Sequence, residues 1–173
     1  IASQADSVTV AGVARTASTA AVAPNTIAVR DASSYLYASQ FNGLATSAQY
    51  ADLAEKYLAD AAYEPGTVLS FGGEQEVTVS SVNMDTRVAG VVSTQPGYIM
   101  NEGLEGNYVS TVALYGRVPC KVRGHVNKGD MLVSAGDGYA RAEVNPTVGS
   151  VIGKALESHG DLEGVIEVVV GRN

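Results

Sequence analysis

The sequence predicts a mainly β protein made of two unlike parts. An extended alanine-rich segment is expected over residues 1–63 and a small β-barrel or β-sandwich domain over residues 64–173. The first part holds 18 alanines and two glycines, whereas the second holds six alanines and 17 glycines. Small residues recur at every third position of the first part, and the second divides into short β-branched runs between glycine turns. The turn signal Glu64-Pro65-Gly66 lies where the composition changes, so we place the boundary there.

The spacing of three in the first part is not that of an amphipathic helix, whose apolar positions alternate between steps of three and four. It favours an extended threefold winding of neighbouring chains. An alanine contributes only about 0.8 kcal/mol per buried methyl-sized group, against an ordering cost of about 1–2 kcal/mol per residue. We therefore expect this segment to become ordered only by association, unless it is a flexible linker. The residues expected to pack between three chains are Ala5, Val8, Ala11, Ala14, Ala17, Ala20, Ala23, Ala45, Ala48, Ala51 and Ala54.

The second part is expected to hold nine short strands, which is typical of a small barrel or sandwich. Glycine-containing turn signals such as Gln95-Pro96-Gly97 and Gly136-Asp137-Gly138 separate most of them. The predicted strands are residues 67–71, 76–82, 87–93, 108–115, 118–122, 131–134, 139–142, 150–156 and 165–170.

Composition and motifs exclude several function classes. The net charge of −7 argues against binding to nucleic acid, which requires a basic face. No window reaches the roughly 18 apolar residues of a membrane span, so we expect no membrane insertion. The single cysteine, Cys120, alternates with Val118 and Val122 as a buried, inert thiol would. His125 and His159 form no zinc signature, and no phosphate loop or dinucleotide fingerprint occurs, so we expect neither a metal nor a cofactor.

Residues 24–43, PNTIAVRDASSYLYASQFNG, combine a short strand, a turn and a second strand rich in aromatic residues. This segment, flanked by spacers rich in alanine, serine and threonine, resembles the short repeat found along phage tail fibres. The resemblance implies a virion location, a homotrimer, and contacts with other fibre or baseplate proteins.

The second part carries a resemblance of its own. The segment DTRVAGVVSTQPGYIM (residues 85–100) is followed by VALYGRVPCKV (112–122), VNKGDMLV (126–133) and IGKAL (152–156). This order resembles the intramolecular-chaperone autoproteolytic domain of phage neck appendages and related fibres. Such domains help three chains to assemble in register, and some then cleave themselves from the fibre.

The expected function is that of a structural virion protein, namely the C-terminal region of a trimeric tail fibre that drives trimerisation and forms the tip. One alternative is self-cleavage, which requires a hydroxyl nucleophile and a nearby acid or base. Ser81 and Asp85 are the candidate catalytic pair, although serine and aspartate also cluster in ordinary turns. Another alternative is a module that binds a glycan receptor on the host surface. Tyrosine suits sugar binding because it joins a flat apolar ring to a polar hydroxyl, and the candidates are Tyr98, Tyr108, Tyr115 and Tyr139.

Overall fold

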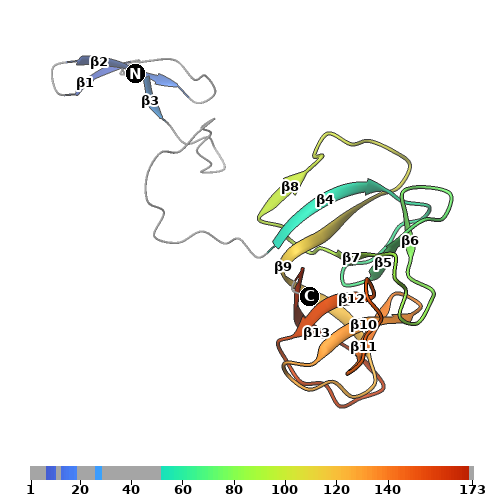
Figure 1. The fold of residues 1–173 in the computed structure, drawn as a ribbon. Coiled ribbons are helices and arrows are strands. Elements are labelled where there is room, and N and C mark those ends of the chain that lie inside the picture. The colour runs from blue at the N-terminus through green and yellow to red at the C-terminus, as the bar shows by residue number, and fades with distance from the viewer. Residues whose placement is uncertain (1–6, 11–12, 19–25, 29–51, 172–173) are drawn as a thin grey trace. The chain divides into compact units, whose positions relative to one another are not determined.

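The computed structural model describes residues 7–10, 13–18, 26–28 and 52–171 (Figure 1). The chain forms two units, Ile1–Ser47 and Ala48–Asn173. In the first, β1 (Ser7–Val10) pairs antiparallel with β2 (Val13–Ser18), and β2 pairs parallel with β3 (Thr26–Ala28). Of the small residues expected to pack between chains, Val8, Ala14 and Ala17 lie in β1 and β2. Ala5, Ala11, Ala20, Ala23, Ala45, Ala48 and Ala51 lie outside the described residues.

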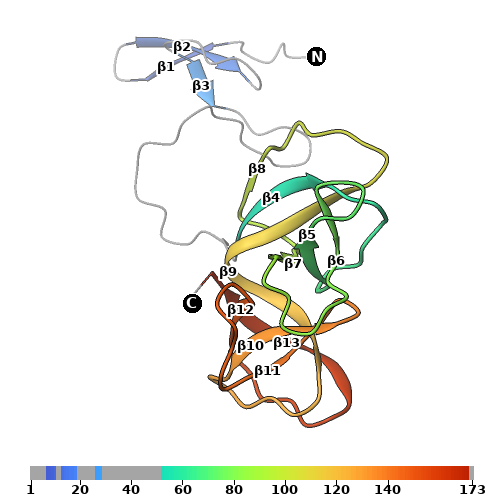
Figure 2. The same cartoon turned by 45° about the vertical axis from the view of Figure 1, so that its right-hand side comes forward.

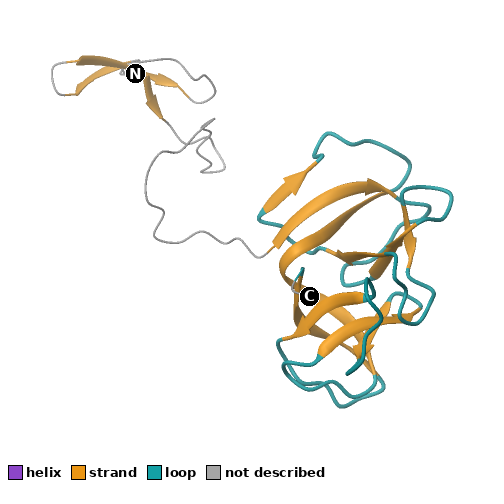
Figure 3. Cartoon of the chain, viewed as in Figure 1, coloured by secondary structure: helices purple, strands orange, loops and turns teal. Residues whose placement is uncertain are grey.

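The second unit consists of strands and turns, and no helix occurs in its described residues (Figure 3). The prediction of a mainly β fold is therefore confirmed. Its strands are β4 (Asp52–Leu58), β5 (Val68–Phe71), β6 (Val77–Val79), β7 (Val88–Val92), β8 (Tyr98–Met100), β9 (Val109–Arg123), β10 (Met131–Gly136), β11 (Tyr139–Ala142), β12 (Val151–Ala155) and β13 (Glu163–Val170).

Five of these strands close a mixed β-barrel. The order is β9–β13–β12–β10–β11, and every neighbouring pair in it is antiparallel. The barrel closes where β11 pairs parallel with β9, with Ala140 opposite Val122. Of the two architectures that the sequence allowed, the barrel is the one observed.

The remaining strands form a sheet on the other half of β9. β9 is 15 residues long, and its first half lies between β4 and β7. β8 flanks β4, while β5 and β6 extend the sheet beyond β7. A single parallel bridge between Ala59 and Val77 joins the end of β4 to β6. Figure 2 shows β9 running continuously from this sheet into the barrel.

Alternating side chains of β9 supply both hydrophobic cores. Val118, Cys120 and Val122 are buried in the barrel together with Leu132 from β10. Val112 is buried in a second cluster with Leu69, where β4 to β7 surround it. This period of two is what a strand with one face on a core requires. Complete burial of a valine or leucine stabilises a fold by about 1.5–3 kcal/mol. Because β9 contributes buried side chains to both clusters, it links the stability of one cluster to that of the other.

Three features differ from the expected strand pattern. The strands predicted over residues 108–115 and 118–122 are one strand, β9. β8 was not predicted, and neither was β4, which the alanine period had assigned to the extended segment. Because β4 pairs with β9 along its whole length, the compact unit includes residues on the N-terminal side of the predicted 63/64 boundary. Ala54, expected to pack between chains, is completely buried within this unit.

Candidate functional site

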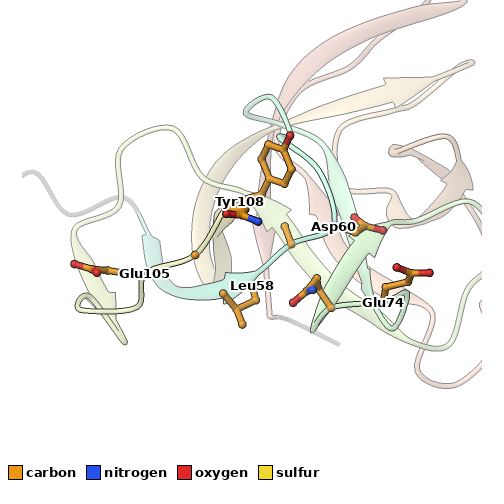
Figure 4. Close-up of a pocket in the computed structure, with 9 residues that line it drawn as sticks. Leu58, Asp60, Glu74, Glu105 and Tyr108 are labelled. Carbon is orange, nitrogen blue, oxygen red and sulfur yellow. The ribbon is translucent and has the colours of Figure 1, made fainter.

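An open pocket lies where three segments meet: the end of β4, the turn between β5 and β6, and the loop between β8 and β9 (Figure 4). Its volume is about 400 Å³, which falls within the range of about 300–1,000 Å³ seen for small-molecule sites. The polar side chains in its lining are those of Asp60, Glu74, Gln75, Glu105 and Asn107.

Hydrogen bonds and one close approach hold the segments that line the pocket. The Ala59 amide donates to the Tyr108 carbonyl at 3.0 Å, and the Leu58 amide donates to Glu76 Oε2 at 2.7 Å. Gly106 allows the loop to approach Leu58 closely, because a Cβ at this position would lie 2.6 Å from Leu58 Cδ2. These contacts hold the lining segments close together, and Leu58 and Ala59 supply the apolar side chains of the lining.

The electrostatic character of the pocket is acidic. None of the nine lining residues is lysine, arginine or histidine. The Tyr63 hydroxyl donates a hydrogen bond to Asp60 Oδ1, and this bond holds the pKa of Asp60 below its ordinary value. The Asp60 carboxylate consequently stays ionised at neutral pH, where it acts as a hydrogen-bond acceptor.

This arrangement can accept hydrogen bonds from hydroxyl or amine groups of a ligand. In Figure 4, Glu74 and Glu105 lie on opposite sides of the pocket, with Leu58 between them. The ring of Tyr108 points away from Leu58. Tyr108 therefore lines the pocket, but its ring does not lie over Leu58.

The structure gives Asp85, one of the two residues considered for self-cleavage, a well-defined set of partners. Asp85 is 5% exposed, and its carboxylate accepts hydrogen bonds from the backbone amide, Nε and Nη2 of Arg87. Burial alone would raise the pKa of Asp85, but the hydrogen bonds from Arg87 outweigh it and lower the pKa. The Asp85 amide donates to Ser134 Oγ at 2.8 Å, which anchors the turn to β10. Ser81 lies on the exposed surface four residues earlier.

The four tyrosines proposed for receptor binding fall into three places. Tyr98 and Tyr115 lie on either side of Leu53, on β8 and β9 respectively. Tyr108 lies in the wall of the pocket. Tyr139 contacts other residues of the same unit. The Arg123 guanidinium lies 4.5 Å from the centre of the Tyr139 ring, and the Tyr139 hydroxyl donates a hydrogen bond to Glu163 at 3.1 Å.

A further polar pair, not found from the sequence, lies where the chain enters the compact unit. Asp52 is only 7% exposed, and Oδ2 of its carboxylate has no hydrogen-bond partner among the described residues. Burial raises the pKa of Asp52, and the neighbouring Ser93 hydroxyl offsets part of this effect. A pattern of residue types cannot reveal such a pair, because the two residues are 41 positions apart and meet only through the sheet.

Neither a metal site nor a membrane-spanning helix occurs in the described part of the chain. No group of three histidine, cysteine, aspartate or glutamate side chains there could hold a metal ion. No helix there is long and apolar enough to cross a membrane. No protein-family model matches the chain, and no curated protein matches it.

Proposed function

We propose that this chain is a structural virion protein, the C-terminal region of a trimeric tail fibre or related appendage. Residues before Asp52 form the fibre segment, and the β unit is the terminal domain that drives trimerisation and forms the tip. Other fibre or baseplate proteins are its partners on the particle. The proposal rests on the two resemblances described above and on one structural observation, the self-contained core of the β unit.

That core supports a role in assembly. The barrel and the second cluster bury large apolar side chains inside one chain, whereas the preceding alanine-rich segment offers few such side chains to bury. A repetitive segment specifies its register weakly. A domain that folds first and then associates can align three such segments at one end.

The first test is the mass of the chain in solution. Light scattering coupled to size exclusion should give three times the chain mass of 17.8 kDa at micromolar concentration. A monomeric mass would refute the proposal. Residues 48–173 alone should fold into the same β-rich unit, which circular dichroism and proteolysis can establish.

The pocket supports a second candidate function, the binding of a host-surface glycan. Carboxylate and amide side chains accept and donate hydrogen bonds to sugar hydroxyls, and Glu105 and Asn107 occupy one loop of the pocket. A glycan array or saturation-transfer NMR should detect binding to the parent chain and at least a tenfold loss in Asn107→Ala. Asp161→Asn, which alters an exposed aspartate in the turn before β13, should bind as the parent does. Failure of the parent to bind any glycan would reject this candidate.

A further inference from the structure

We infer that a row of three side chains on β8, β4 and β9 is the surface through which the compact unit contacts other copies of this chain. The row consists of Tyr98, Leu53 and Tyr115. This inference rests on the proposed trimer and identifies the face of the domain that forms it.

Strand register places the three side chains side by side. Leu53 of β4 is the partner of Tyr98 in the parallel pairing with β8 and of Tyr115 in the antiparallel pairing with β9. Directly paired residues project from the same face of a sheet. Ala54, the next residue of β4, is buried on the opposite face, so the row lies on the face of the sheet that Ala54 does not occupy.

The row is apolar and exposed. Tyr98 is 66% exposed, Tyr115 is 48% exposed and Leu53 is 36% exposed. Tyrosine is enriched at the centres of protein interfaces, where its ring supplies contact area and its hydroxyl supplies a hydrogen bond. The row therefore has the composition expected of an interface centre.

The path of the chain indicates which partner covers the row. Asp52, where the chain enters the unit, and Val170, where it leaves β13, both pair with Gly116. Gly171 lies against Tyr115, since a Cβ on Gly171 would be 2.7 Å from Tyr115 Cδ2. Both ends of the compact unit thus lie beside the row.

This position favours a second copy of the same chain. If the segments before Asp52 wind about one axis in the trimer, their three points of entry must lie close to that axis. The side chain of Leu53 follows immediately after the point of entry, and its neighbours Tyr98 and Tyr115 extend the same face. Three copies arranged in this way would bring their rows together around the axis.

Cysteine cross-linking can test the arrangement without interference from the native thiol. Cys120 is completely buried, and burial raises its pKa to about 12, so it remains an unreactive thiol at neutral pH. In the full chain, Tyr98→Cys treated with a short bis-maleimide should give covalently linked copies on a denaturing gel.

Leu162→Cys is the matched control. Leu162 is 86% exposed, and its carbonyl accepts a hydrogen bond from Gly124, just beyond the other end of β9. At about 3.4 Å per residue this end lies about 25 Å along the strand from Gly116. Leu162→Cys should therefore cross-link at least fivefold less than Tyr98→Cys. Equal cross-linking of the two variants would overturn the inference.

A charge variant separates this inference from the proposed trimer itself. Leu53→Asp places a carboxylate in the row, and the partial exposure of Leu53 allows the domain to fold, which its circular dichroism can verify. Light scattering over a dilution series should show at least a tenfold rise in the concentration at which the trimer dissociates. A trimeric parent with an unaffected Leu53→Asp variant would overturn the inference alone, whereas a monomeric parent would overturn the proposed function as well.

Discussion

Replacing Leu132 by alanine should measure how strongly the barrel core stabilises the compact unit. Leu132 is completely buried on β10, opposite Gly153 and Ala142 on the two flanking strands. The substitution removes three carbon atoms, worth about 2.4 kcal/mol at about 0.8 kcal/mol each. A closed barrel cannot collapse fully into the space left, so a cavity adds to the cost. We expect the free energy of unfolding to fall by about 3–4 kcal/mol in total.

Leu69→Ala is the companion variant in the second cluster, where Leu69 is equally buried. The strand β9 contributes Val122 to the barrel core and Val112 to the second cluster, so the two clusters should unfold together. Both variants should therefore shift one common transition. Urea unfolding followed by circular dichroism and by tyrosine fluorescence would show this, as the chain has nine tyrosines and no tryptophan. Val148→Ala, at a position 94% exposed, should change the free energy by less than about 0.5 kcal/mol.

Two outcomes would refute this reasoning. A loss below about 1 kcal/mol in Leu132→Ala would mean that the barrel relaxes around the missing atoms. Two separate transitions, each moved by only one of the variants, would mean that the shared strand does not couple the clusters.

Three further predictions concern single positions. Burial raises the pKa of Asp52 above its ordinary value of 3.8. Ionisation of Asp52 therefore destabilises the fold as the pH rises through the folded-state pKa. Asp52→Asn should raise the melting temperature at pH 7 and change it little at pH 3. The pKa of Asp85 is lowered, so its ionised form stabilises the fold above pH 3.8 and this contribution is lost as the pH falls through the lowered pKa. Asp85→Asn should therefore lower the melting temperature at pH 7, and this difference from the parent should disappear in acid. For Asp52→Asn or Asp85→Asn, a difference from the parent that stays constant across pH would contradict the pKa shift assigned to that residue. In Gly153→Ala the new Cβ would lie 2.0 Å from the Val169 carbonyl oxygen, so β12 and β13 should separate and circular dichroism should show a largely unfolded chain; a melting temperature equal to the parent's would contradict the geometry.

Several strands were predictable because their side chains alternate between a core and the surface. Residues 139–142 alternate and were predicted with the bounds of β11. The single strand β9 was divided in two because Gly116 and Arg117 interrupt its apolar run. The strand nevertheless continues, since pairing with β4 and then with β13 holds the backbone on both sides of Gly116.

β4 was missed because its composition is misleading. Ala51 and Ala54 extend the spacing of three from the preceding segment, while Asp52 is an unusual residue for a buried position. Tertiary pairing with β9 overrides both signals. The sequence contains the residues of this strand but no local sign of its partner.

The pocket could not be predicted from the sequence, for a similar reason. Asp60, Glu74 and Glu105 lie on three separate segments, and only the folded sheet brings them to one opening. The four tyrosines were chosen as receptor-binding candidates by their residue type, and Tyr98, Tyr108 and Tyr115 are exposed. Their grouping, with Leu53 between Tyr98 and Tyr115, depends on strand register.

The long strand β9 also has a consequence for how the chain reaches its native state. The first half of β9 pairs with β4, which precedes it in the sequence, and the second half pairs with β13, which follows it. Within this second pairing, Glu163 is 40 positions away from Arg123. Such non-local pairing raises contact order, so we expect folding within about milliseconds to seconds. The barrel can close only when β13, its last strand in the sequence, pairs with β9, so the barrel core cannot be complete before that pairing forms.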